Sequence, residues 1–174
     1  METLKAILLD RTAPIKQVAT DFVLKHPEKF NDLKEWSFSD EQPVAWRAAW
    51  ILGNLLRKNP EFIPDMQSSV SRIIQSFSSF KTPGQIREYL KIIQLLEVDE
   101  EQMGYLLQMC FDWLIDRKSD DAFRIYSMQI IFDYAKKVPD LFPELQAIIE
   151  QEMEYAKPGF KSRGKKILKF IQKL

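Results

Sequence analysis

The chain of 174 residues has very little of the chemistry from which catalytic and metal centres are built. A single cysteine, Cys110, excludes an internal disulfide framework and a zinc site made of cysteines. A single histidine, His26, excludes every mechanism that needs two, and five glycines leave little material for phosphate-binding loops. We therefore expect a protein that is not an enzyme, with no catalytic residue, no cofactor and no metal ion.

Long apolar runs and a strong charge bias are also lacking. No stretch reaches about 18 uncharged apolar residues, and the run at 6–9 is too short for the core of a signal peptide. We therefore expect no transmembrane segment and a cytoplasmic location. The 25 basic residues are balanced by 25 acidic ones, which removes the simplest argument for a dedicated nucleic-acid binder.

What the sequence does contain is helical periodicity along almost its whole length. Apolar residues recur in steps of three and four, as in Met66, Val70, Ile73, Phe77 and Phe80, which places them on one face of a helix. No Asn-Gly or Asp-Gly turn and no convincing alternating strand occurs. The pattern predicts an all-α fold with helices near residues 2–9, 14–26, 28–37, 43–58, 61–78, 83–97, 99–116, 120–137, 140–156 and 160–173.

A nine-residue corner recurs three times, at residues 25–33, 58–66 and 137–145. Each copy reads basic, any, Pro, acidic, any, apolar, any, acidic, apolar. The basic residue favours the negative end of one helix, and the proline stops that helix and begins the next. The prolines Pro27, Pro60 and Pro139 are spaced by one and then about two steps of roughly 40 residues, and a degenerate copy fits near 97–100. Repeats of this length built from two helices indicate a helical solenoid.

Four arginines, Arg47, Arg87, Arg124 and Arg163, recur at nearly the same period. The segment 43–55 around Arg47 resembles the second helix of a HEAT repeat, with its Arg-Ala-Ala core followed by Leu-Gly, and the other three arginines resemble later copies. Lys16 stands where the first copy would have arginine. The resemblance implies one domain, a right-handed α-α superhelix (a HEAT-like, armadillo-like solenoid). Its approximate antiparallel helix pairs are 1–26, 27–58, 59–97, 98–137 and 138–174.

In HEAT proteins the second helices line a concave face that holds another macromolecule, so the resemblance implies a non-enzymatic scaffold or adaptor that binds a protein partner. A stripe at helical spacing offers an aromatic and cationic surface for this role. The candidate partner-binding residues are Trp46, Arg47, Trp50, Asn54, Arg87, Lys91, Lys165 and Lys169. The alternative is that both tryptophan rings pack against the neighbouring repeat. The sequence leaves the oligomeric state open.

Other residues have structural interpretations. His26 precedes a proline at a helix end, where it favours a capping role, and Cys110 is expected to be a small buried hydrophobe. Trp36 and Trp113 are expected in the core. The segments 105–115 and 122–135 are apolar enough to be helices covered on two sides.

Helix-start signals occur at Thr82, Asp99 and 119–121, the first as a capping box with Gln85. The acidic residues Glu150 and Glu154 are expected on a solvated surface. The segment 157–159 is expected to end the preceding helix.

Charge is uneven despite the zero total. Residues 157–174 hold seven basic residues and no acid, which leaves 18 basic against 25 acidic residues elsewhere. This last helix is either the polar cap of a solenoid or a site for an anionic partner, a phosphate backbone or a membrane surface. The alternative function is nucleic-acid binding like that of the DNA alkylation-repair glycosylases, which share a HEAT-like solenoid. Trp46, Trp50 and the basic last helix favour it, but no aspartate matches that motif.

Overall fold

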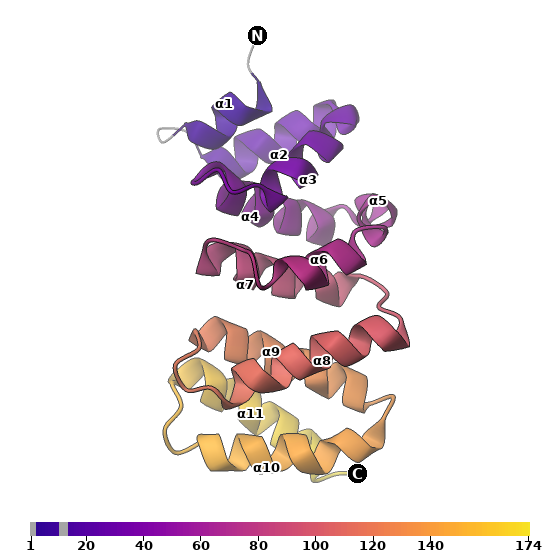
Figure 1. Ribbon diagram of the computed structural model, residues 1–174, viewed down its shortest axis with the longest axis vertical. Coiled ribbons are helices and arrows are strands. Elements are labelled where there is room, and N and C mark those ends of the chain that lie inside the picture. Colours follow the sequence, from indigo (N-terminus) through magenta and orange to yellow (C-terminus); the bar gives the residue numbers. More distant parts are fainter. Residues whose placement is uncertain (1–2, 11–13) are drawn as a thin grey trace. The chain divides into compact units, whose positions relative to one another are not determined.

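The computed structural model describes residues 3–10 and 14–174, and in these residues it contains eleven α-helices, four short 3₁₀ turns and no β-strand (Figure 1). The all-α prediction is therefore confirmed. The chain forms two compact units, residues 1–98 and 99–174. The division into five pairs within one domain stays a prediction.

Unit 1 is organised around α4, which packs against α1, α2, α3 and α7. One face of α4 is built from alanine and branched aliphatic residues, which allow its backbone to lie close to its neighbours, and these residues are fully buried. The helices are α1 (Leu4–Leu9), α2 (Ile15–Lys25), α3 (Phe30–Phe38), α4 (Val44–Lys58), α5 (Ile63–Gln67), α6 (Val70–Ser76) and α7 (Pro83–Ile92). The 3₁₀ turns are η1 (Pro27–Lys29), η2 (Pro60–Phe62) and η3 (Ile93–Leu95).

Unit 2 is organised around α9, which packs against α8, α10 and α11. Its elements are α8 (Glu100–Ile115), α9 (Asp121–Ala135), η4 (Pro139–Leu141), α10 (Phe142–Glu152) and α11 (Pro158–Ile171). Eight residues of α9 are buried, as the prediction of a helix covered on two sides requires. For α8 that prediction is wrong. Its buried residues Leu106, Cys110 and Leu114 form one stripe, and Tyr105 and Ile115 are exposed.

The three proline corners have the same backbone geometry. The residues before the prolines have φ and ψ of −132° and 70° at His26, −133° and 77° at Asn59, and −127° and 80° at Val138. In each corner the proline begins a 3₁₀ turn that leads directly into the next α-helix. Proline disfavours the helical conformation for the residue before it, and the same sequence produces the same turn three times. The predicted repeat is thus visible in the backbone.

The predicted helix starts are present. Thr82 Oγ1 accepts the Gln85 N–H at 3.3 Å, Asp99 Oδ1 accepts the Gln102 N–H at 2.8 Å, and Asp120 accepts the Ala122 N–H. The capping box at Thr82 is only half formed. The buried Gln85 amide nitrogen donates to the carbonyl oxygens of Ser37 and Ser39. Its amide oxygen accepts from the Thr82 hydroxyl at 3.4 Å, and not from the backbone N–H of Thr82.

Two predicted helix boundaries are wrong. The helix expected at 61–78 is divided into α5 and α6, because Ser69 N–H bonds to the Met66 carbonyl three residues back in place of the four-residue α pattern. The helix expected to end at 157–159 ends already at Glu152. Pro158 is instead the first residue of α11, a position where its missing N–H has no cost.

Trp36 and Trp113 are half-buried, so the prediction that they belong to the core is wrong. The Lys5 ammonium lies 4.6 Å from the Trp36 ring, and the Trp113 ring lies 5.7 Å from that of Phe123. Both indoles cover the edge of the packed interior, as aromatic rings with a polar end commonly do.

Candidate functional site

The predicted site begins with two helices of unit 1 that lie side by side. A Cβ built on Gly84 of α7 would be 3.5 Å from Trp46 Cβ of α4, and one built on Gly53 of α4 would be 3.4 Å from Glu88 Oε2 of α7. Contacts that advance together along both helices mean that α4 and α7 run in the same direction. Their shared surface is called the α4–α7 face below, and it contains Trp46, Trp50, Asn54, Arg57, Arg87 and Lys91.

Trp46 and Trp50 lie next to each other on this face. Their ring centroids are 6.2 Å apart with a tilt of 32°, and both side chains are half-buried. Trp46 fills the space that Gly84 leaves free, whereas the Lys16 ammonium of α2 lies 5.6 Å from the Trp50 ring. Each indole is thus partly packed and partly accessible, which is intermediate between the two alternatives of free and packed rings.

Arg47 has a structural contact. Its Nη1 donates to the Leu8 carbonyl in the last turn of α1 at 2.7 Å, and Arg124 Nε likewise donates to the Leu114 carbonyl in the last turn of α8 at 3.1 Å. Two of the four recurring arginines therefore satisfy the free carbonyl end of another helix. Arg87 is exposed, and Arg163 donates to Gln129, so these two occupy different surroundings.

A buried carboxylate lies beneath the face. Glu88 is only 1% exposed, and its Oε1 is 2.8 Å from Lys91 Nζ and 3.5 Å from Arg87 Nε. Its Oε2 has no hydrogen-bond partner among the described residues, and the opening left by Gly53 brings Arg57 Nη1 toward the same point. The buried Glu88 carboxylate thus holds the positive groups of Arg87 and Lys91 on the face that contains the tryptophans. Sequence reasoning missed it, although its position next to Arg87 and three residues before Lys91 was the available signal.

The predicted partner-binding residues fall into two groups. Six of them, Trp46, Arg47, Trp50, Asn54, Arg87 and Lys91, lie on α4 and α7 of unit 1. Lys165 and Lys169 lie exposed on α11 of unit 2. The residues of the first group lie on two adjacent helices. Arg47 donates to α1, and its guanidinium also lies 5.9 Å from the Trp46 ring.

Unit 2 contains the densest charge network of the described residues. Arg117 makes three hydrogen bonds of 2.9 to 3.1 Å to the Glu152 carboxylate, and Arg124 Nη2 donates to Glu152 Oε2 at 2.8 Å. The hydrogen bonds from Arg117 are the main reason that the pKa of Glu152 is lowered. The two guanidinium groups lie 4.4 Å and 4.7 Å from the ring centroids of Tyr155 and Phe160, respectively.

A pocket of about 350 Å³ lies beside this network. It is lined by Arg117, Lys118, Asp121, Arg124 and Lys157, among others. Most of these charges have partners within the fold, because Lys157 Nζ lies 2.6 Å from Asp121 and both arginines contact the one carboxylate of Glu152. The arrangement serves to join the turn after α10 to the start of α9.

The remaining candidates have structural surroundings. Cys110 is fully buried, and burial raises the pKa of its thiol to about 12, so the reactive thiolate is suppressed. His26 ends α2, where its ring lies 4.9 Å from that of Phe22. In residues 3–10 and 14–174, no group of three or more His, Cys, Asp and Glu side chains is placed to hold a metal ion. No helix in the same ranges is long and apolar enough to cross a membrane.

Paired helices joined by a recurring proline corner define an all-α helical-repeat protein. The family model described as HEAT repeat domain matches residues 9–171. The chain therefore belongs to the HEAT repeat domain family. Comparison with curated proteins found no significant match. Comparison with solved structures likewise found none.

Proposed function

We propose that this protein is a non-enzymatic scaffold or adaptor that binds another protein through the α4–α7 face. The observation that carries the proposal is the half-buried Trp46–Trp50 pair, with the Lys16 ammonium 5.6 Å from the Trp50 ring and the Arg47 guanidinium 5.9 Å from the Trp46 ring. Binding hot spots in protein interfaces are enriched in tryptophan and arginine, and they lie in partly preformed surroundings. Membership of the HEAT repeat domain family supports a binding role, since helical-repeat proteins use extended surfaces of this kind.

The chemistry of the face favours an acidic partner segment. Arg57 and Arg87 are exposed, Lys16 and Lys91 are half-exposed, and the nearby carboxylate of Glu88 is buried. A partner would therefore meet positive charge and the edges of two indoles. A carboxylate next to an apolar side chain would pair with an arginine while the apolar group covers Trp50.

The test is a quantitative pull-down from native lysate with mass-spectrometric readout. The test variant combines Trp50→Ala with Arg87→Glu, which changes one indole and one exposed cation. The control variant combines Tyr105→Ala with Lys118→Glu, which makes the same chemical changes at exposed positions of unit 2. The proposal expects proteins that are captured by the wild type and by the control and lost with the test variant. Identical profiles for all three chains, or no captured protein, would contradict it.

Lys91 is unsuitable for this test, although it lies on the face. Its ammonium pairs with Oε1 of the buried Glu88 at 2.8 Å. Charge reversal there would place two carboxylates together in a buried site and would destabilise the fold. Loss of binding would then report unfolding. Arg87 Nε lies farther from the same carboxylate, at 3.5 Å, and its side chain is 45% exposed, so Arg87→Glu is the milder change. Thermal unfolding of the test variant must match the wild type before lost binding is assigned to the face.

Nucleic-acid binding is the alternative function, and the cations and indoles of the α4–α7 face favour it. A duplex-binding titration at two salt concentrations separates the two functions. The affinity of a nucleic-acid binder falls steeply with salt because counterions are released from the phosphates. Absence of such binding, together with a protein captured through Trp50 and Arg87, would support the adaptor.

A further inference from the structure

Helix α11 carries exposed lysines in two adjacent rows. Lys165 and Lys169 are four residues apart and form one row, which Lys173 extends just beyond the helix. Lys166 and Phe170 form the next row, extended by Leu174. Residues four apart on a helix lie on the same side, so the rows make one continuous surface about 12 Å long. This surface is called the lysine stripe below.

The lysines of the stripe have no hydrogen bond or ion pair within the described residues, whereas the other cations of the same segment contact groups of the fold. Lys157 pairs with Asp121, Lys161 donates to the Glu154 carbonyl, and Arg163 donates to Gln129. These three cations, at the start of α11 and on its side toward α9, therefore make contacts within the fold. Those of the stripe stay available to an external anion.

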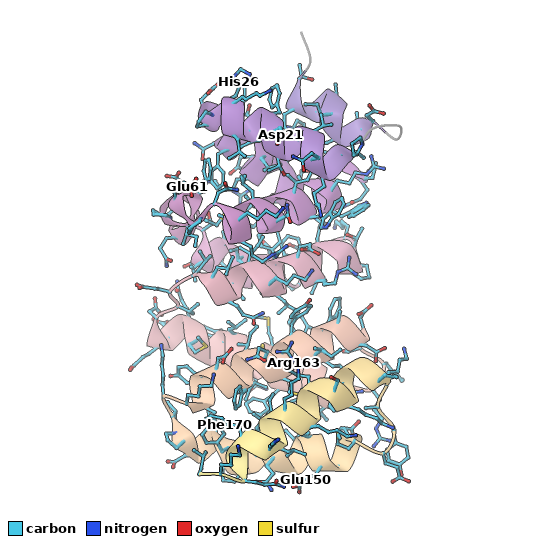
Figure 2. The ribbon with its side chains drawn as sticks, turned by 180° about the vertical axis from the view of Figure 1, so that it is seen from behind. Asp21, His26, Glu61, Glu150, Arg163 and Phe170 are labelled. Atoms are coloured by element: carbon cyan, nitrogen blue, oxygen red, sulfur yellow. The ribbon has the colours of Figure 1, made fainter. Side chains whose placement is uncertain are left out.

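Phe170 and Leu174 give the stripe an apolar edge. The Phe170 ring packs edge-on against Phe132 at 5.1 Å, yet the residue is 40% exposed, and Leu174 is 76% exposed. Figure 2 shows Phe170 on α11, the helix that lies across this view of unit 2. Phe170 is thus held in place by the core while part of it faces solvent beside the lysines.

Unit 2 is strongly polarised in charge. Residues 99–156 contain 5 basic and 13 acidic residues, whereas residues 157–174 contain seven basic residues and no acidic one. A negatively charged surface would therefore attract the α11 segment more strongly than the rest of unit 2, over distances of about a Debye length of 8–10 Å.

The composition of the stripe favours a lipid surface over a nucleic acid or a folded protein. It contains lysines and no arginine, so it lacks the planar groups that recognise phosphates or carboxylates with two parallel hydrogen bonds. Its length of about 12 Å covers few phosphates of a duplex. Lysines beside exposed phenylalanine and leucine are the combination that binds the charged headgroups and shallow apolar region of an anionic bilayer.

We propose that the lysine stripe binds the surface of a bilayer rich in anionic lipid. Lys165, Lys166, Lys169 and Lys173 contact the headgroups, and Leu174 with the exposed edge of Phe170 reaches the upper acyl region. The interaction is peripheral and reversible, because few apolar groups enter the lipid. It leaves the α4–α7 face out of the interaction, so the proposal does not depend on the protein partner.

The test measures co-sedimentation of the whole chain with vesicles of phosphatidylcholine alone or with 30% phosphatidylserine. The test variant is Lys165→Gln, Lys166→Gln, Lys169→Gln. The control variant is Lys25→Gln, Lys81→Gln, Lys118→Gln, which removes the same charge from exposed lysines elsewhere. Leu174→Gln tests the apolar edge. Circular dichroism and thermal unfolding verify that all variants fold.

The proposal expects binding to the phosphatidylserine vesicles that weakens with salt. The test variant should reduce the partition coefficient by about 100-fold, given the usual contribution of each lysine near an anionic surface, while the control retains most of the binding. Leu174→Gln should reduce it several-fold. Equal reduction by test and control variants, or no preference for phosphatidylserine, would overturn the proposal. Tighter binding of the same lysines to a DNA duplex than to vesicles would also overturn it.

Discussion

Arg124 and Glu152 form a buried ion pair that joins the first turn of α9 to the end of α10. Arg124 Nη2 lies 2.8 Å from Glu152 Oε2, and both side chains are 6% exposed. Arg117 covers the carboxylate from the solvent side with three further hydrogen bonds. Two positively charged guanidinium groups therefore neutralise one buried carboxylate. Both arginines depend on this carboxylate as their counter-ion.

Replacement of that carboxylate should be costly. Glu152→Gln keeps the shape but removes the charge, which leaves the buried Arg124 without its counter-ion, so we expect a loss of about 3 kcal/mol or more in the free energy of unfolding. Urea unfolding followed by circular dichroism measures the change. Glu150→Gln, on an exposed position of the same helix, should change it by less than about 0.5 kcal/mol. Similar values for both variants would show that the network contributes nothing to stability.

The free energy of unfolding should also fall in acid, because carboxylates that accept hydrogen bonds from arginine become protonated. The pKa of Glu152 is lowered in the folded state, chiefly by its hydrogen bonds from Arg117, so its contribution is complete above the ordinary carboxyl pKa near 4.5. It is lost as the pH falls through the lowered pKa of the folded state. The pKa of Glu35 is lowered in the same direction by hydrogen bonds from Arg72, so the wild type should become less stable below about pH 4.5.

The same measurement has an internal control. In Glu152→Gln the titrating group is gone, so the stability difference between wild type and variant should shrink as the pH is lowered from about 7 to about 3. Thermal unfolding at a series of pH values gives this difference. A difference that stays constant or grows in acid would contradict the assigned direction of the pKa shift.

Two helical glycines should respond to alanine with opposite sign. A Cβ on Gly164 would lie 2.9 Å from Ile149 Cγ2, so Gly164→Ala should overpack the α10–α11 contact and cost about 1–3 kcal/mol. A Cβ on Gly104 would meet nothing within 4 Å, so Gly104→Ala should stabilise α8 by roughly 0.5–1 kcal/mol. Urea unfolding of both variants measures the effects. Stabilisation by Gly164→Ala would mean that the two helices are farther apart than described.

The start of α8 offers a test of a helix cap. Asp99→Ala should cost about 1 kcal/mol, because the Gln102 N–H loses its acceptor at 2.8 Å. Asp99→Asn keeps an acceptor at this position and should stay within a few tenths of a kcal/mol of the wild type. Thermal unfolding distinguishes the two variants. Equal losses of stability in both variants would show that Asp99 acts through its charge near the helix start and not through the hydrogen bond.

Local signals in the sequence predicted the fold well. Prolines 27, 60 and 139 produce three corners with nearly identical dihedral angles, because proline restricts its own φ and the conformation of the residue before it. Thr82, Asp99 and Asp120 begin helices as their side chains predict. Such effects involve only a few neighbouring residues, so a single sequence reveals them.

Long-range effects were not visible in the sequence. Glu152 differs from the surrounding acidic residues in the cation that the fold brings to it, Arg124, 28 residues away in the sequence. Glu88 has a local signal in Lys91, three residues later, but its burial depends on the packing of α7 against α4. Likewise, the half-burial of Trp46 depends on Gly84 in another helix. The candidate site could therefore be located on its helix, but its packing and its buried carboxylate could not be predicted.

Site-specific photo-crosslinking shows whether a protein partner contacts the α4–α7 face. A benzoylphenylalanine replaces Arg87 in one chain and Lys118 in a second, both exposed positions, and irradiation in native lysate is followed by identification of the adducts. We expect a defined protein adduct from position 87 that is missing from position 118. No adduct at position 87, or the same adducts at both positions, would contradict such a contact.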